Sequence, residues 1–394
     1  MLKDRLYNQN KLTEDDEREI MSLVKKRIKK DELFVNSNFL NREEFRGKLY
    51  ILLKDEIEKK YPCSDFNVEK NLINKMISEI FGLGILEDFL QDKLVTDIFI
   101  QDNEMIIIRN GIKEYLGKTF NSLDDVYLII DRIKSNTGKT VDQRIPFMNT
   151  ELYDGSRCSI VIPPISDKVY ISIRVFNCID FNLEDLLKLN MFDKKHHGIL
   201  KDLVNKRNNI LIAGSMGSGK TTLLNTLAKL ISRNEFINII QDVPEIKLKE
   251  HPFVRMLCTR TKSRESDNEI NQDRLVFETL RMKADRIILG EVRDSMAAYQ
   301  MLQALNVGHR GSFSTIHADS AIDSLLRLET LAMEYKTNIS NYVVKKMISR
   351  AIDAVLFLDC EKDENFNIYN RKLREILLLD NNLNEGGDYK LEYL

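Results

Sequence analysis

The chain has 394 residues, of which 43% are apolar and 30% are charged, and its formal net charge is −2. This composition excludes a disordered chain, and at about 150 residues per domain the length predicts two or three folded domains. The nearly neutral charge gives no whole-chain reason to expect a nucleic-acid partner, and five scattered cysteines without a C-x-x-C pair argue against a disulfide framework or a zinc cluster.

Residues 1–80 are predicted to form a short helical module. Apolar residues recur there at helical spacing, for example at Ile20 and Val24 and again at Leu49 and Ile57. The first residues lack the apolar core of a signal peptide, and no run of 18 apolar residues occurs anywhere in the sequence. We therefore expect a cytoplasmic protein with no direct membrane span, whose membrane association comes through partners.

Residues 81–178 change in texture and predict an α+β domain. Short apolar strands alternate with turns, and two of the strands carry an arginine, Arg157 and Arg174. The expected strands lie at 98–100, 105–108, 157–164 and 170–176, and the expected helix at 126–135. Residues 179–190 are predicted to be a linker.

Residues 191–394 are predicted to form an α/β domain with a parallel central sheet. Strands alternate with amphipathic helices, which is typical of a parallel sheet with helices on both faces. The expected strands are 210–213, 236–241, 286–290 and 312–316, the expected helices are 221–231, 274–282, 295–305 and 320–334, and further strands are expected at 355–358 and 374–379.

The segment from Gly214 to Thr221 reads G-S-M-G-S-G-K-T and fits the phosphate-binding pattern G-x-x-x-x-G-K-[ST]. An apolar strand precedes it and an amphipathic helix follows, so its N–H groups and the helix N-terminus can favour an anion. The alternative is a glycine-rich turn without a ligand. The pattern predicts that ATP or GTP is bound by Gly214, Ser215, Met216, Gly217, Ser218, Gly219, Lys220, Thr221 and Thr222.

Hydrolysis also needs groups that hold a metal and orient water. Glu291 ends one predicted strand, and Asp242 and Glu245 follow another, so all three carboxylates are expected at the edge where the phosphate loop lies. We expect Thr221 and Glu291 to hold magnesium and Glu245 to orient the water. His317 ends a further strand at the same edge and could sense the γ-phosphate, although Glu291 and His317 could each be structural.

Four segments in this order resemble the Walker A, Asp, Walker B and His boxes of the type II/IV secretion ATPase superfamily. They are G-S-M-G-S-G-K-T, Q-D-V-P-E, L-R-M-K-A-D-R-I-I-L-G-E-V-R-D and G-H-R-G-S-F-S-T-I-H-A-D-S. The resemblance covers about residues 80–360. It is greatest to the CpaF-like ATPases of tight-adherence (Flp) pili, which share the D-G-S-R and I-P-P segments.

The resemblance implies a homo-hexameric ATPase motor that powers assembly of a type IV or Flp-like pilus, or secretion, through an inner-membrane platform protein. Each subunit would have a RecA-like P-loop ATPase domain. The implied roles are phosphate contact for Lys220, Walker B acid for Glu291, catalytic carboxylate for Glu245 and His-box histidine for His317. The implied candidates for phosphate contacts within or between subunits, each of which could instead be an ordinary ion-pairing residue, are Arg157, Arg174, Arg255, Arg260 and Arg281.

Two departures from the family pattern leave alternatives open. Gln241 stands where the Asp box usually has Glu, which supports a non-hydrolysing scaffold as one alternative. The tetracysteine zinc module of other branches is absent from the sequence. A retraction motor and a nucleic-acid translocating ATPase are further alternatives, although the net charge and the absence of tryptophan make nucleic acid an unlikely partner.

Overall fold

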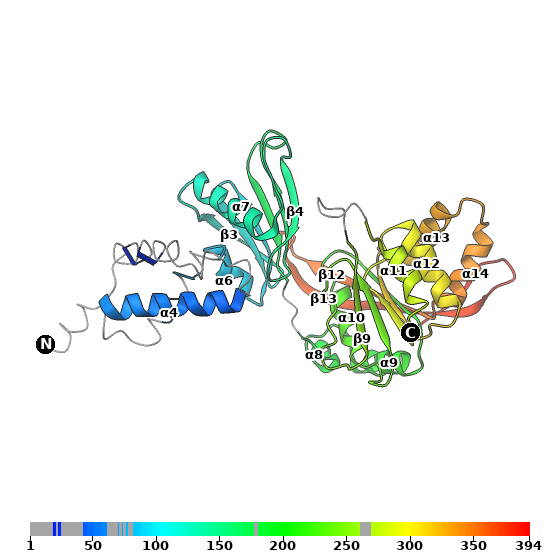
Figure 1. Cartoon of the computed structure of the whole chain (residues 1–394). Helices are drawn as coiled ribbons and strands as arrows, with labels where there is room; N and C mark the ends of the chain where they lie inside the picture. Colours follow the sequence, from blue (N-terminus) through cyan, green and yellow to red (C-terminus); the bar gives the residue numbers. More distant parts are fainter. Residues whose placement is uncertain are drawn as a thin grey trace. The chain divides into compact units, whose positions relative to one another are not determined.

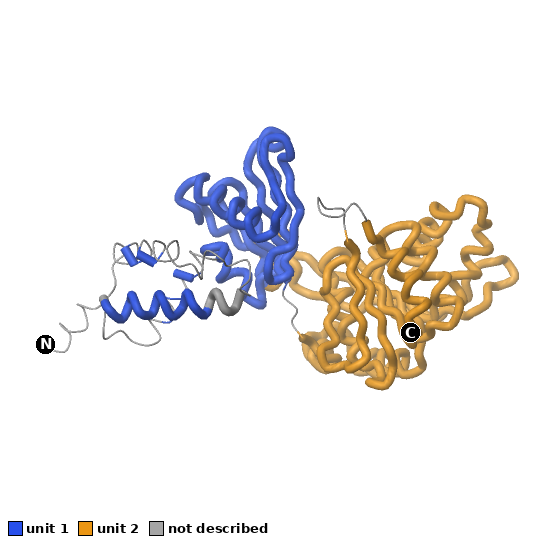
Figure 2. The backbone as a smooth tube through the Cα atoms, viewed as in Figure 1, with its two compact units in different colours: residues 1–109, 114–177 blue, residues 110–113, 178–394 orange. Residues whose placement is uncertain are grey.

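The computed structural model describes residues 19–20, 23–24, 42–60, 70, 73, 76–77, 82–176, 180–260 and 269–394, with the side chains of 42–46 and 60 outside the description. The chain divides into two compact units (Figure 2). Unit 1 comprises residues 1–109 and 114–177, and unit 2 comprises residues 110–113 and 178–394. Much of the predicted helical module, and Cys63 and Cys178, lie outside the described residues.

Helix α4 (Arg42–Lys60) supplies an apolar face to a small core of its own in unit 1. Leu49, Leu53 and Ile57 recur every four residues and are fully buried, because side chains at that spacing share one face of a helix. The other residues of this core are Ile20, Val24, Ile73, Met76 and Ile77.

The rest of unit 1 is a six-stranded sheet covered by one long helix (Figure 1). The strand order is β3-β2-β1-β6-β5-β4, and β1 pairs antiparallel with both β2 and β6. Ser122 caps α7 through a capping box, and Gly138 ends it in a left-handed conformation. The elements are α6 (Leu86–Gln91), β1 (Val95–Gln101), β2 (Glu104–Arg109), β3 (Ile112–Lys118), α7 (Leu123–Thr137), β4 (Phe147–Glu151), β5 (Arg157–Val161) and β6 (Tyr170–Arg174).

Unit 2 is built on an eight-stranded sheet with a parallel centre, as the sequence predicted. The order is β14-β13-β12-β7-β11-β10-β8-β9. In this order, neighbouring strands from β12 through β7, β11, β10 and β8 to β9 are parallel. Strands β13 and β14 extend the sheet at one side and pair antiparallel. The strands are β7 (Ile210–Gly214), β8 (Ile237–Gln241), β9 (Val254–Cys258), β10 (Arg286–Leu289), β11 (Phe313–His317), β12 (Ala354–Lys362), β13 (Ile368–Leu383) and β14 (Tyr389–Tyr393).

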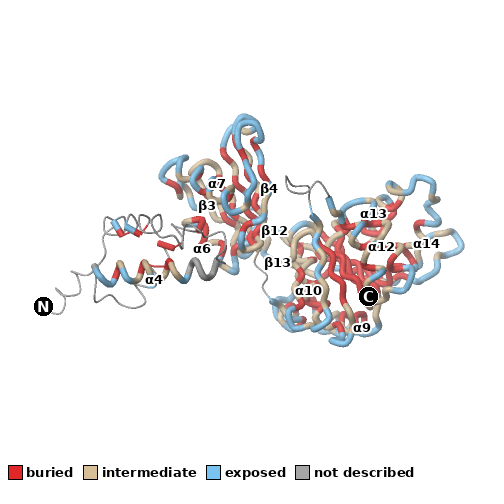
Figure 3. The backbone as a smooth tube through the Cα atoms, viewed as in Figure 1, coloured by how far each residue is buried: buried red, intermediate tan, exposed pale blue. Residues whose placement is uncertain are grey.

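Helices cover both faces of this sheet, so its central strands are buried throughout (Figure 3). Along β7, Leu211 and Ala213 face one apolar core, whereas Ile210 and Ile212 face the other. Helices α8, α9 and α10 contribute to the second core and α11, α12, α13 and α14 to the first. The helices are α8 (Leu183–Lys188), α9 (Lys194–Asn205), α10 (Lys220–Ala228), α11 (Gln272–Thr279), α12 (Ser295–Asn306), α13 (Ala321–Tyr335) and α14 (Asn341–Ala351).

Helix α8 lies within the predicted linker at 179–190. Its Leu183 and Leu186 are buried in a core of unit 2, so this part of the predicted linker belongs to unit 2. None of the helices within the described ranges is long and apolar enough to cross a membrane.

Candidate nucleotide site

The loop between β7 and α10 is shaped by glycines in conformations that other residues avoid. Gly214 has φ +154°, and a Cβ on it would lie only 2.2 Å from the backbone oxygen of Leu358 on β12. Gly219 has φ +94° and is followed at once by the first turn of α10. The helix start leaves backbone N–H groups without helical partners, and its dipole favours negative charge. The loop therefore fits the phosphates of a nucleotide.

Lys220 places a buried cation beside this loop, with only 8% of the residue exposed. Its Nζ donates to the backbone oxygens of Gly214 at 2.9 Å and Ser215 at 2.8 Å. Neutral carbonyls bind an ammonium less strongly than phosphate oxygens do, because hydrogen bonds between two charged groups are the stronger kind. A nucleotide phosphate can therefore draw Lys220 away from these contacts.

His317, the last residue of β11, joins Lys220 to Glu291. Its Nδ1 lies 3.2 Å from Lys220 Nζ, and its Nε2 lies 3.1 Å from Glu291 Oε1. An ammonium can only donate, so Nδ1 must accept and the proton of the neutral ring is assigned to Nε2. Burial and the charge of Lys220 lower the pKa of His317, against the opposing effect of Glu291. The neutral ring is thus the form that fits this site.

Glu291 follows β10 and is held firmly by its neighbours. The backbone on either side is tied to β11, since Thr315 Oγ1 donates to the Gly290 oxygen and the Val292 N–H donates to the Thr315 oxygen. The carboxylate receives Arg293 Nε at 2.8 Å and Nη2 at 2.7 Å. These contacts place a negative charge at the carboxyl end of the parallel strands, beside Lys220 and His317.

Arg293 extends the cluster to the loop that follows β8. Its Nη1 lies 3.4 Å from Asp242 Oδ2, and the other oxygen of Asp242 accepts from Thr259 Oγ1 and Gln272 Nε2 at 3.0 Å each. The carboxylates of Glu291, Asp242 and Glu245 raise the pKa of Arg293. Polar contacts therefore run without interruption from the phosphate loop to α11.

The loop after β8 also contains Gln241 and Glu245. Gln241 is buried, and its Oε1 accepts the backbone N–H of Ile246 at 3.0 Å. This bond closes the loop that carries Asp242 and Glu245. Gln241 thus has a structural task that needs an acceptor oxygen and no charge. Glu245 is half-buried, and its charge acts on Arg293.

The protein residues at this site could bind magnesium only together with oxygens from a bound nucleotide and from water. No group of three or more His, Cys, Asp or Glu side chains in the described part of the chain is placed to hold a metal ion. Magnesium commonly takes phosphate and water oxygens and only one or two protein oxygens. Thr221, at the second position of α10, and Glu291 can supply such oxygens, so the residues present fit that mode of binding.

The sequence from residue 69 to residue 379 matches the family described as "Type II/IV secretion system protein". The chain belongs to this family. It is an ATPase of the type II/IV secretion superfamily, the superfamily that the four sequence segments predicted.

Two relatives illustrate this membership. Protein MJ0781 of Methanocaldococcus jannaschii is 31% identical over 240 residues, a stretch that covers 59% of this chain and 33% of that protein. The present chain thus spans about a third of that relative's length. The type IV secretion system protein VirB11 of Bartonella quintana is 31% identical over 285 residues, covering 62% of this chain and 78% of VirB11.

A solved structure shares the fold. The pilus retraction motor PilT, crystallised with ADP, superposes with a TM-score of 0.53 and 18% sequence identity, covering 75% of this chain and 82% of PilT. This agreement confirms the RecA-like α/β fold class of the secretion ATPases.

The arginine candidates lie in separate places. Arg157 and Arg174 are partners on the adjacent strands β5 and β6 of unit 1. In unit 2, Arg255 stacks on Phe236 at 5.0 Å and donates to the backbone oxygen of Met282.

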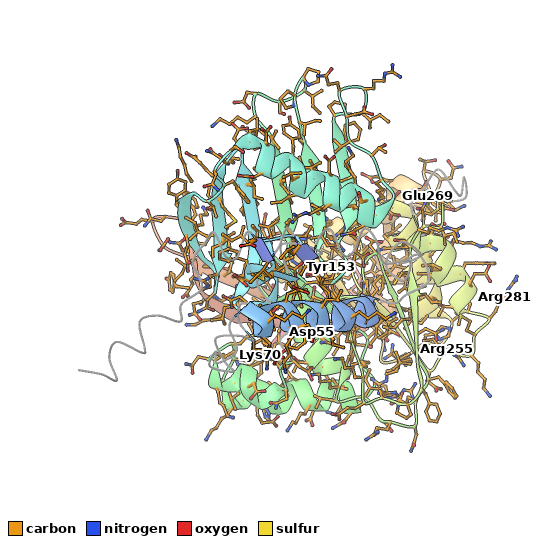
Figure 4. All side chains as sticks on the ribbon, turned by 60° about the vertical axis from the view of Figure 1, so that its left-hand side comes forward. Asp55, Lys70, Tyr153, Arg255, Glu269 and Arg281 are labelled. Carbon is orange, nitrogen blue, oxygen red and sulfur yellow. The ribbon has the colours of Figure 1, made fainter. Side chains whose placement is uncertain are left out.

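Arg281 is exposed over the ring of Phe277, and Figure 4 labels it together with Arg255. Both Arg281 and Met282, the partner of Arg255, precede β10 and so lie toward the amino ends of the parallel strands. The phosphate loop follows a carboxyl end. Arg255 and Arg281 therefore lie toward the opposite ends of the strands from the phosphate loop of their own chain, whereas Arg260 follows β9 and lies toward the carboxyl ends.

Sequence reasoning did not single out two arginines of this ATPase. Arg293 could have been noticed, because it stands two residues after Glu291 in the same box. Arg371 on β13 donates from Nε to the backbone oxygen of Gly217 at 2.8 Å, and 154 positions separate the two residues. No local pattern signals such a contact.

Proposed function

We propose that this ATPase is a motor that powers pilus assembly or protein secretion through an inner-membrane platform protein. The observation that carries the proposal is the contact series Lys220–His317–Glu291, which joins the phosphate loop to the Walker B acid at one sheet edge. A site that only bound nucleotide would not need this linked set of a cation, a neutral histidine and a carboxylate.

Lys220 would leave the carbonyls of Gly214 and Ser215 when a triphosphate enters, since its Nζ can then donate to charged oxygens. His317 would lose its partner at Nδ1 at the same moment. The ring could then turn toward the γ-phosphate or the attacking water. Occupancy of the phosphate site would in this way be transmitted to Glu291 through His317.

Glu245 is the residue we assign to orienting the attacking water, and Thr221 and Glu291 are the protein ligands we assign to magnesium. Bound magnesium would neutralise charge on the phosphates during transfer. Arg293 lies among the carboxylates of Glu291, Asp242 and Glu245 and balances their charge. The positive charge of Arg293 thus offsets part of the negative charge around the reacting phosphate.

The assembly that we propose is a homo-hexamer at the cytoplasmic face of the cell membrane, with nucleotide held near subunit boundaries. Its support is family membership and two exposed arginines, Arg174 on the sheet of unit 1 and Arg281 toward the amino ends of the strands of unit 2, which would lie within reach of a neighbour's nucleotide in a ring. The D-G-S-R and I-P-P segments favour the CpaF-like, Flp-pilus branch. The boundaries predicted at residues 80, 178 and 190 remain part of this proposal.

A gene deletion tests the proposed function. Loss of surface pili or of a secreted protein on deletion, restored by the natural gene and not by Lys220→Ala, is the expected result. Normal pili and secretion in the deletion strain would contradict the proposal. Retraction in place of assembly would show as an excess of surface pili in the deletion strain.

A further inference from the structure

The hairpin of β12 and β13 packs against the phosphate loop from outside the Walker and His boxes. Cys360 Sγ lies 3.4 Å from Ser215 Oγ, and a Cβ on Gly217 would lie 2.9 Å from the side chain of Ile368. Arg371 Nε donates to the Gly217 oxygen at 2.8 Å. The loop thus has a second wall that no family box describes.

Arg371 differs in its environment from Arg374, the next arginine on β13. Within the described residues it makes that one hydrogen bond and no ion pair, and burial lowers its pKa with no carboxylate to oppose the effect. Arg374, three residues later, is exposed and pairs with Glu361. A half-buried guanidinium without a carboxylate is costly unless its hydrogen bond or a nearby anion compensates.

The bond from Arg371 determines how one peptide group of the loop is turned. In a trans peptide the carbonyl of Gly217 and the N–H of Ser218 point in opposite directions. With the carbonyl directed outward to Arg371, the Ser218 N–H faces the inside of the loop, where its only backbone contact among described residues is a long 3.4 Å approach to the Ser215 oxygen. Such a weakly engaged donor is available to a phosphate oxygen.

We propose that Arg371 is a positioning residue of the nucleotide site, which holds the Gly217–Ser218 peptide so that the Ser218 N–H points at the phosphates. Its aliphatic stem also packs on the loop, since a Cβ on Gly219 would lie 3.5 Å from Arg371 Cδ. The inference rests on nucleotide binding and is independent of what the motor drives.

Arg371→Met tests the inference, because methionine keeps an unbranched stem over Gly219 and removes the donor. Arg371→Lys keeps a donor, and Arg374→Ala is the control on the same strand. The probes are inorganic pyrophosphate and ADP, each competing with a fluorescent ATP analogue. Pyrophosphate has no base or ribose, so it reports on the phosphate loop alone.

We expect Arg371→Met to weaken pyrophosphate and ADP equally, by about tenfold each. The KM for ATP should rise more than kcat falls, Arg371→Lys should recover part of the loss, and Arg374→Ala should bind as the natural protein does. Unchanged pyrophosphate binding in Arg371→Met would overturn the inference, and so would a loss confined to ADP. If Arg371→Met does not fold, Arg371→Lys and Arg371→Gln are compared instead. The inference would then be overturned if Arg371→Lys bound pyrophosphate no more tightly than folded Arg371→Gln. Lys220→Ala that still hydrolyses ATP would refute the nucleotide-site assignment instead.

Discussion

The two edges of the parallel sheet in unit 2 use the same residue types in opposite ways. At the amino ends, Arg286 is 2% exposed and donates to both oxygens of Glu235 and to the backbone oxygens of Val204 and Gly311. At the carboxyl ends, the side chain of Arg293 is 51% exposed and divides its donors between Glu291 and Asp242.

The histidines differ in the same manner. His309 precedes β11 and bonds the backbone oxygen of Ala284, whereas His317 ends β11 between Lys220 and Glu291. At the amino edge, the donors of Arg286 and His309 are occupied by groups of the fold. At the carboxyl edge, the partly exposed Arg293 and His317 have partners that a ligand could replace. The two clusters thus differ in whether their contacts can be replaced, and not in the types of residue they contain.

The largest effect should come from Lys220→Ala at the carboxyl edge. The variant lacks the buried cation that attracts the phosphates, so ATP turnover should fall to background while the fold persists. Phosphate release measures turnover, and circular dichroism checks the fold. Normal phosphate release would remove the basis for contrasting the two edges.

Glu245→Gln should separate binding from hydrolysis. The amide fills the same space and lacks the negative charge, so an ATP analogue should bind with its natural affinity while phosphate release falls by about 10² or more. Fluorescence titration and phosphate release from one preparation give both values. A variant that hydrolyses ATP at the natural rate would exclude Glu245 as the catalytic carboxylate.

Arg286→Met should show the opposite behaviour at the amino edge. Burial alone would raise the pKa of Glu235, and Arg286, with a smaller contribution from Arg207, outweighs that effect and lowers it. Removing the guanidinium leaves a largely buried carboxylate without its main partner, which should lower the free energy of unfolding by about 3 kcal/mol.

Urea unfolding measures this loss of stability. The control is Arg274→Met, which breaks the exposed pair of Arg274 with Glu278 on α11 and should cost less than about 0.5 kcal/mol. Equal losses in the two variants would show that burial does not distinguish these pairs.

The smallest effect should be a fall in turnover at low pH, the acid limb of the pH profile, caused by protonation of His317. The pKa of His317 lies below the ordinary 6.5. Above pH 6.5 the ring is neutral and its contribution to stability is fully present, and this contribution is lost as the pH falls through the lowered pKa. Protonation would turn Nδ1 into a donor facing Lys220.

Profiles of kcat/KM from about pH 5 to 8 should therefore rise and then level for the natural protein. His317→Gln should lack this limb, and His309→Gln should retain it. A limb that survives in His317→Gln would belong to another group.

Much of this sheet could be predicted from the sequence. Strand 210–213 is apolar throughout, and 312–316 alternates Phe313 and Ile316 with small polar residues; both are bounded by turns or helices, and the structure confirms them within a residue. The convergence of Lys220, Glu291 and His317 followed from parallel topology, because each ends or follows a strand. Strand β9 was not predicted, since its partly exposed sequence V-R-M-L-C has no continuous apolar run.

The sequence could draw attention to Arg293, which stands beside Glu291, but it could not predict the contacts that Arg293 and Arg371 make. Each depends on the direction of a long side chain, and Arg371 also on a hairpin that returns to the loop from the far end of the chain. Gln241 looked like a lost charge, but its buried amide proved to close the loop that carries Asp242.

The most direct test of the difference between the edges is ATP turnover in the matched pair Arg293→Met and Arg286→Met, measured below the melting temperature of both. We predict that Arg293→Met lowers turnover by about tenfold with little change in melting temperature, whereas Arg286→Met keeps its turnover per folded molecule and melts earlier. Equal turnover losses in both variants, or a loss in Arg286→Met alone, would contradict the account.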